Sequence, residues 1–181
     1  MDFYAATIAL GAVLLLGILQ GIMLAALASV AILLFLATRP NVAFLGRVPG
    51  TNSFSDMARH PENLPLPGVI AFRPEASVMY FNSDFVLESV LARVAENAPK
   101  TIRLVVCDLS TSPYLDLSGS RMLHALHDEL ATREIALRIV GARGHIRDLL
   151  RGDGVGDKVG GIDRFATLDA LIGKTGQIPA S

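Results

Sequence analysis

The chain has 181 residues, enough for one ordinary domain and a further segment. Its net charge of −1 argues against a protein that binds nucleic acid through its charge. Its single cysteine excludes an internal disulfide and offers no partner for a cysteine zinc site. Apolar residues make up 51% of the chain and its mean hydropathy is +0.47, which is high for a soluble domain, and the excess lies in the first forty residues.

The N-terminal segment is a long uncharged run. No charged residue occurs between Asp2 and Arg39. A straight helix over residues 3–38 would be about 54 Å long, whereas the hydrocarbon core of a bilayer is about 30 Å thick. One straight membrane span is therefore too long for this run, and the run is also too long for the apolar region of a signal peptide.

A break in the run comes at two glycines, Gly17 and Gly21, which flank a glutamine. We therefore expect a transmembrane helical hairpin in residues 1–39, with helices over residues 4–16 and 22–38 joined by a tight turn. The small residues that recur in both halves let helix backbones approach closely, so they predict packing against other membrane helices. A buried hairpin of a soluble protein is the alternative.

Arginines follow the run, and the positive-inside rule then places the following domain on the cytoplasmic side of an inner or plasma membrane. These arginines are Arg39, Arg47, Arg59 and Arg73. Residues 40–68 are expected to form a linker with one short extended segment at 42–45, because their prolines exclude a long helix. The prolines are Pro49, Pro61, Pro65 and Pro67.

Residues 69–173 are predicted to form an α/β domain with a mixed β-sheet covered by α-helices, because its later strands alternate with helices. Strands are expected over 69–73, 77–81, 102–108 and 136–141, and helices over 84–97, 117–133, 145–150 and 168–172. Asn82 and Ser83 can cap the first helix and Thr167 the last. We expect residues 152–156 to form a loop, Phe165 to begin a short edge segment and residues 174–181 to be a flexible tail.

The stretch 104–119 is the centre of the predicted domain. An apolar run typical of a strand buried on both faces ends at Asp108, and a polar turn that contains Ser110 follows it. A helix then begins at Asp116, with Ser118 and Gly119 in or near its first turn. Free N–H groups gather there and can hold a phosphate or another anion, although Asp116 equally suits a simple helix cap.

The rest of the sequence gives only weak signals for catalytic, metal-binding or phosphate-binding sites. Cys107 lies in the buried strand pattern, so we interpret it as a core residue. Ser118 and His124 do not share a helix face, and no nucleophile elbow is present. The histidines lack the spacing of a metal site, and the glycines of 152–161 lack the Lys-Ser/Thr of a phosphate loop. We therefore expect no catalytic residues, no metal and no cofactor.

Three pieces of the sequence resemble motifs of one protein family, and they occur in the same order as in that family. Thr-Arg-Pro-Asn-Val-Ala-Phe-Leu-Gly-Arg at 38–47 is similar to the junction between the last membrane helices and the cytoplasmic domain of SulP-type anion transporters. Pro-Gly-Val at 67–69 with Tyr-Phe-Asn at 80–82 resembles the opening of that domain. Asp-Leu-Ser at 108–110 with Asp-Leu-Ser-Gly at 116–119 resembles the signature loop of STAS domains. Gln20 departs from the family, in which a proline is common at this position.

The resemblance implies the C-terminal part of a sulfate-permease-type carrier: its last membrane helices and its STAS domain. It implies a role in regulation and assembly rather than complete transport, because the family's substrate site is formed by earlier segments. The implied partners are the membrane, the remaining transmembrane segments, a second copy through the transporter and a regulatory protein, with no nucleic acid.

A second branch of the same family leaves an alternative open. In anti-sigma-factor antagonists a partner kinase phosphorylates the serine that matches Ser118. A phosphate there would add about −1.5 to −2 charge beside a helix N-terminus, where Asp116 would repel it. The apolar hairpin favours the transporter interpretation, since soluble antagonists need none.

Overall fold

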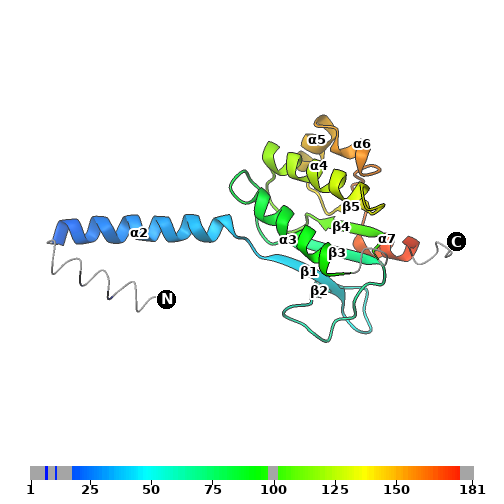
Figure 1. The fold of residues 1–181 in the computed structure, drawn as a ribbon, viewed down its shortest axis with the longest axis horizontal. Coiled ribbons are helices and arrows are strands. Elements are labelled where there is room, and N and C mark those ends of the chain that lie inside the picture. Colours follow the sequence, from blue (N-terminus) through cyan, green and yellow to red (C-terminus); the bar gives the residue numbers. More distant parts are fainter. Residues whose placement is uncertain (1–6, 8–10, 12–17, 98–101, 176–181) are drawn as a thin grey trace. The chain divides into compact units, whose positions relative to one another are not determined.

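A computed structural model of the chain describes residues 7, 11, 18–97 and 102–175 (Figure 1). The chain divides into two compact units, Met1–Arg39 and Pro40–Ser181, and we call the second unit the domain. Among its described residues, the first unit contains one long apolar helix, α2 (Ile18–Thr38). At 1.5 Å per residue, the 21 residues of α2 extend about 32 Å.

Helix α2 begins at Ile18, four residues before the predicted start at residue 22. The prediction of a tight turn over 17–21 is therefore wrong for residues 18–21, the part that the structure describes. Gln20 and Gly21 are both helical. A glycine inside a helix costs only about 1 kcal/mol, and an apolar chain keeps its backbone hydrogen bonds by staying helical. The predicted helix over 4–16 lies outside the described residues except for Thr7 and Gly11, which are helical, so the hairpin stays a prediction.

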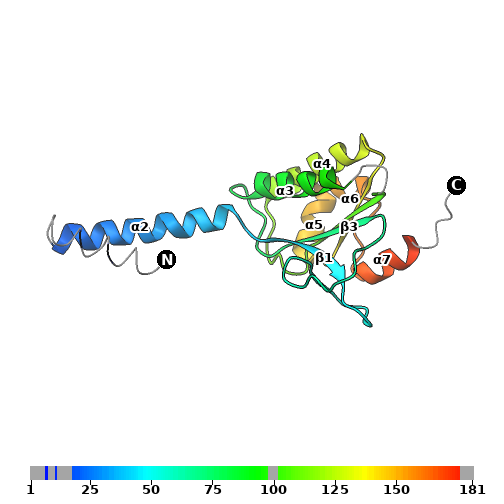
Figure 2. The same cartoon turned by 60° about the horizontal axis from the view of Figure 1, so that its bottom comes forward.

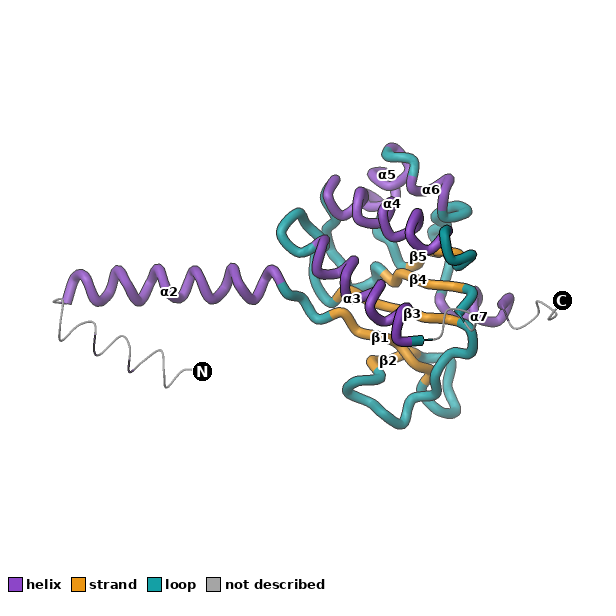
Figure 3. Tube along the Cα trace, viewed as in Figure 1, coloured by secondary structure: helices purple, strands orange, loops and turns teal. Residues whose placement is uncertain are grey.

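The described residues of the domain form a five-stranded mixed sheet with the strand order β2-β1-β3-β4-β5 (Figure 3). Antiparallel pairing joins β1 to β2 and to β3, whereas β3, β4 and β5 run parallel. The strands are β1 (Val42–Arg47), β2 (Phe54–Asp56), β3 (Val69–Pro74), β4 (Leu104–Asp108) and β5 (Ala136–Val140). The predicted α/β fold with a mixed, helix-covered sheet is confirmed.

Helices cover both faces of the sheet (Figure 2). The helices of the domain are α3 (Ser83–Glu96), α4 (Leu117–Ala131), α5 (Gly144–Gly152), α6 (Val155–Lys158) and α7 (Leu168–Thr175). Phe72, Val105 and Ile139 point into the larger core, which α3 to α6 close. Ala71 and Val106, from the opposite face, pack in a smaller core with Leu168 of α7. Both faces of the central strands are therefore buried, as their continuous apolar runs predict.

The prediction that residues 40–68 are irregular apart from 42–45 is wrong. Strand β1 extends to Arg47, and Phe54–Asp56 forms β2 at the edge of the sheet. The prolines of this segment exclude helix, but none of them lies in either strand. Pairing with β3 across an intervening segment stabilises β1, and no local pattern reports such a contact.

The strand predicted over 77–81 is also wrong, because Asn82 folds this segment into a turn. Its side-chain oxygen accepts from the backbone N–H of Met79 at 2.9 Å, and its amide nitrogen donates to the carbonyl of Ser77 at 3.1 Å. Only Val78 makes a bridge, to Leu115. Asn82 occupies the N-cap position of α3 as predicted, yet its side chain does not cap the helix.

Two smaller predictions near the C-terminus need correction. The loop predicted over 152–156 instead holds the end of α5 and the start of α6. Phe165 lies in a turn rather than in an edge segment and is 77% exposed. Thr167 does cap α7, because its hydroxyl accepts from the backbone N–H of Ala170 at 3.3 Å. Residues 173–175 belong to α7, and residues 176–181 lie outside the described residues.

Candidate functional site

The site begins where the parallel strands β3 and β4 end side by side. The register pairs Phe72 with Cys107, so Arg73 lies beside Asp108. The Arg73 guanidinium donates to one carboxylate oxygen of Asp108 through Nη2 at 2.7 Å and Nε at 2.8 Å. The other oxygen accepts from the backbone N–H of Ser110 at 3.0 Å. Asp108 is 5% exposed, so this carboxylate organises the turn rather than meeting a ligand from solvent.

The turn after Asp108 is tied to the end of β3. The hydroxyls of Thr111 and Ser112 both donate to the carbonyl oxygen of Pro74, at 3.0 and 3.1 Å. Ser112 is fully buried, whereas Ser110 is exposed. The polar residues of this loop thus satisfy backbone groups at the edge of the sheet, as buried polar groups must.

Asp116 caps α4, as the capping interpretation predicts. One carboxylate oxygen accepts from the backbone N–H of Gly119 and the other from the N–H of Tyr80, both at 2.9 Å. The cap therefore serves two elements: it satisfies the first turn of α4 and fastens the 78–80 segment to it. The negative charge of Asp116 complements the positive end of the helix dipole, at the position where the sequence also allowed a bound anion.

Gly119 allows a close approach between α4 and the 78–80 segment. A Cβ atom at this position would lie 2.8 Å from Leu115 Cγ and 2.9 Å from the carbonyl oxygen of Val78. Any side chain would push the two segments apart. The glycine of the Asp-Leu-Ser-Gly motif is therefore required by packing.

Ser118 is the one predicted site residue that lines a hollow, although the exposed Ser110 hydroxyl is also without a hydrogen-bond partner among the described residues. Ser118 is half-buried, and its hydroxyl has no hydrogen-bond partner among the described residues. It lines a hollow of about 340 Å³ between α3 and α4, together with Tyr80, Asp84 and Arg121. The five predicted residues thus divide into Asp108, Ser110, Asp116 and Gly119, which build the loop, and Ser118, which faces the hollow.

Comparison with known families identifies this arrangement. Residues 60–170, more than half of the chain, match the STAS domain family. The chain belongs to the STAS domain family. Over 95% of its length the chain is 31% identical to sulfate transporter 2.1 of Arabidopsis thaliana, and over 94% it is 30% identical to low affinity sulfate transporter 3 of Stylosanthes hamata. It therefore corresponds to the C-terminal STAS region of SulP-type transporters.

The chain spans only 27% and 28% of the lengths of these two relatives. The fold of its STAS region is also that of a solved transporter. The structure of the murine solute carrier 26 family member A9 anion transporter superposes with a TM-score of 0.77 at 16% identity, over 97% of this chain and 29% of that one. This likeness is one of fold.

Two residues of the STAS site escaped the sequence analysis. Arg73 was counted only among the arginines of the positive-inside rule, although it pairs with Asp108. The signal that could have found it is the position of both charges at the ends of predicted neighbouring strands. Gly141, with a φ of +69°, lies so close that a Cβ atom would be 2.7 Å from Asp108 Oδ1 and 2.8 Å from Ser110 N. No sequence signal indicated this contact.

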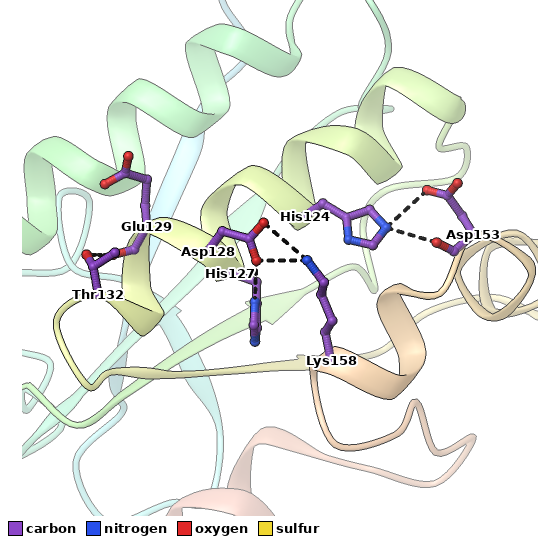
Figure 4. Close-up of polar contacts among 7 residues, drawn as sticks. All are labelled: His124, His127, Asp128, Glu129, Thr132, Asp153 and Lys158. Atoms are coloured by element: carbon purple, nitrogen blue, oxygen red, sulfur yellow. Dashed lines mark hydrogen bonds and ion pairs between the residues drawn. The ribbon is translucent and has the colours of Figure 1, made fainter.

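A second polar cluster, formed by Ser120, His124 and Asp153, joins α4 to the turn after α5, and Figure 4 shows its His124 and Asp153. The buried Ser120 hydroxyl donates to the Asp153 carboxylate at 2.6 Å, and His124 Nε2 lies 3.4 Å from the same carboxylate and 2.9 Å from the Asp153 carbonyl. In a serine hydrolase the histidine lies between the serine and the aspartate. Here Asp153 lies between the other two, so the cluster joins α4 to the turn after α5 and does not activate a nucleophile.

One helical turn further along, Asp128 forms a contact with α6 that makes a testable electrostatic prediction. Lys158 Nζ lies 2.8 and 3.1 Å from the two carboxylate oxygens of Asp128, and His127 Nδ1 lies 2.9 Å from one of them. The Lys158 hydrogen bond, followed by that of His127, lowers the pKa of Asp128 from 3.8 to about 2. We expect Lys158→Ala to raise this pKa toward its ordinary value and Lys158→Arg to keep it low.

The measurement is the ¹³C chemical shift of the Asp128 carboxylate as a function of pH. Because the folded pKa is depressed, the stabilising contribution of the contact is present above pH 3.8 and disappears as the pH falls through about 2. An unchanged titration in Lys158→Ala would contradict the assignment of Lys158 as the main cause.

Cys107 offers a chemical test of the core. The pKa of its thiol is raised well above 9.0, mainly by burial and then by the charge of Asp108. The thiolate is the reactive form, so we expect no alkylation of the folded chain by a maleimide at pH 8 and full alkylation in denaturant, read by mass spectrometry. A Ser53→Cys variant, which places a thiol in an exposed loop, serves as the positive control and should gain one adduct under native conditions. Rapid native labelling of Cys107 would contradict its burial.

Proposed function

We propose that the chain is the membrane-anchored C-terminal STAS portion of a SulP-type transporter of inorganic, sulfate-like anions. In this role it serves regulation and assembly and is not a complete carrier by itself. The observation that carries the proposal is α2 directly before a STAS domain. Its 21 residues extend about 32 Å, close to the roughly 30 Å hydrocarbon core, and only Gly21 among them is buried.

The comparisons support the class of substrate and partner. Both relatives named above are called sulfate transporters, and the chain spans little more than a quarter of either. The remaining transmembrane segments of the carrier are then its first partner, and a second copy meets it through the transporter. The arginines that follow α2 favour a cytoplasmic domain.

The first experiment asks whether α2 holds the full chain in a bilayer. After expression in bacteria, we expect the chain to stay in the membrane pellet through a carbonate wash. Leu27→Arg combined with Val30→Arg should release it, because each arginine at the bilayer centre costs about 2.5–3.5 kcal/mol. Both positions are exposed on α2. Release of the unsubstituted chain would overturn the proposal.

Orientation is tested separately in intact cells. A Ser53→Cys variant should resist a maleimide that does not cross membranes, and should react once the cells are opened. Labelling before lysis would place the domain on the other side and contradict the cytoplasmic assignment.

A signalling module of the anti-sigma-factor-antagonist type is the second candidate, and Ser118 is the observation that favours it. Its hydroxyl is free of partners within the described chain and shares a hollow with Arg121, three residues further along α4. With a cognate kinase, this function predicts one phosphorylated species that Ser118→Ala abolishes and Ser110→Ala retains. A chain that no cognate kinase phosphorylates would exclude it.

A further inference from the structure

Exposed apolar side chains gather at one end of the STAS domain. Tyr80, Phe81, Tyr114 and Leu117, which we call the aromatic end, are 73%, 36%, 51% and 46% exposed. Among the described residues from 40 to 175, Leu64 and Phe165 alone join them as large exposed apolar residues. Scattered apolar residues need no explanation, but a concentration of them indicates an interaction surface.

The aromatic end is held together by the signature loop. The N–H of Val78 donates to the carbonyl of Tyr114 at 3.1 Å, and the N–H of Asp116 donates back to the carbonyl of Val78 at 3.2 Å. Asp116 also accepts from the N–H of Tyr80. The rings of Tyr80 and Phe81 meet edge to face with centroids 5.2 Å apart. These hydrogen bonds hold the backbone that carries the exposed side chains, so the side chains stay next to one another on the surface.

This end of the domain is also where the chain enters it. Strand β1 begins at Val42, which pairs with Pro74 at the end of β3. Asn41 and Glu75 are joined twice, by a backbone hydrogen bond of 2.9 Å and a side-chain hydrogen bond of 2.7 Å. The Ser112 hydroxyl, in the signature loop, donates to the carbonyl of Pro74. Only two residues of sequence separate Asn41 from the end of α2.

The chemistry of the exposed residues fits the boundary between lipid and water. Tyrosine combines an apolar ring with a hydroxyl and is enriched at the headgroup level of membranes. Arg121 lines the hollow beside Tyr80 together with Asp84, and the exposed Arg143 lies two residues before His145, whose ring stacks on Tyr114. Arginines at such a boundary can reach phosphate groups while aromatic rings rest among the upper acyl chains.

We propose that the aromatic end contacts the headgroup region of the bilayer that α2 spans, so that the signature loop of this STAS domain lies against lipid. The proposal rests on the proposed function, because it requires α2 to be membrane-inserted. Two attachments, a spanning helix and an interfacial surface, would then fix the orientation of the domain, whereas a single short tether would leave it free to rotate.

The full chain provides a clean test because it contains no tryptophan. Tyr80→Trp and Tyr114→Trp each introduce a single fluorescent reporter at the aromatic end. Phe165→Trp is the matched control, because Phe165 is also exposed but lies away from the aromatic end. Phe165 precedes α7, and Asp169 of α7 pairs with Arg47. Arg47 is the last residue of β1, whereas the chain enters the domain at the first residue of β1. Each variant is reconstituted into phosphatidylcholine vesicles, with or without bromine near the headgroup end of the acyl chains, and recovered by flotation.

We expect the emission of Trp at positions 80 and 114 to be shifted to the blue and quenched by the brominated lipid, and that of Trp at position 165 to remain unquenched. Equal quenching at all three positions, or none at any of them in vesicles that float with the protein, overturns the proposal. The second of these results would mean that the aromatic end lies in water rather than against lipid. Failure of the chain to float with the vesicles would instead refute membrane anchoring, and so separates the two proposals.

Discussion

Replacing Gly141 by alanine is expected to destabilise the domain by about 2–5 kcal/mol. The residue has a φ of +69°, a conformation that costs a residue with a Cβ atom about 1–2 kcal/mol. The new methyl group would also lie 2.7 Å from Asp108 Oδ1 and 2.8 Å from Ser110 N, and relieving such overpacking costs about 1–3 kcal/mol more. The turn after β4 would have to move, and it carries the start of the signature loop.

Gly50→Ala is the control for this variant. Gly50 has a φ of +73°, but a methyl group at this position would meet no atom within 4 Å, so the variant isolates the backbone cost. Thermal unfolding of the full chain in mild detergent can be followed by the reactivity of Cys107, which is buried until the domain opens. Gly141→Ala should unfold at a lower temperature than Gly50→Ala. Equal midpoints would show that the turn tolerates a methyl group there.

Much of the fold could be predicted from the sequence because its strongest signals are local. The apolar run before Asp108 is long enough for a buried strand, and the spacing of Val86, Val90 and Val94 is helical; both elements are present. The capping role of Asp116 followed from its position before a helix. These predictions depend on residues within one or two turns of each other.

The failures have two different causes. The segment 40–68 holds more strand than the extended stretch predicted at 42–45, because β1 pairs with β3 across an intervening segment and β2 pairs with β1. The 77–81 segment is a turn because of a short-range contact, in which the Asn82 side chain accepts a hydrogen bond from the N–H of Met79. The site also combines local signals with contacts between distant segments. Its motif was recognisable, but the contacts that shape it, Tyr80 with Asp116 and Gly141 against Asp108, follow from how loops meet at one end of the sheet.

The ion pair between Arg73 and Asp108 yields the second large effect. Arg73→Leu leaves the Asp108 carboxylate, whose side chain is 8% exposed, with only the Ser110 N–H as a hydrogen-bond partner among the described residues. Removing one member of a buried pair costs about 3–5 kcal/mol. Because the Arg73 side chain is 23% exposed and water can reach the gap it leaves, we expect a loss near the lower limit, about 3 kcal/mol.

A double-mutant cycle separates the charge of Asp108 from its role in the turn. Asp108→Asn keeps an oxygen for the Ser110 N–H and removes the charge, so adding Arg73→Leu to it should cost less than Arg73→Leu alone, with a coupling of about 1–3 kcal/mol. Arg59→Leu is the control, since the Arg59 side chain is 73% exposed and its Nε lies 4.0 Å from Asp56 Oδ2, beyond hydrogen-bond distance, so its loss should cost about 0–1 kcal/mol. Additive losses in the cycle would mean that Arg73 stabilises β3 by packing alone. A coupling of the expected size would instead mean that the two parallel strands are locked together at the end that carries the signature loop.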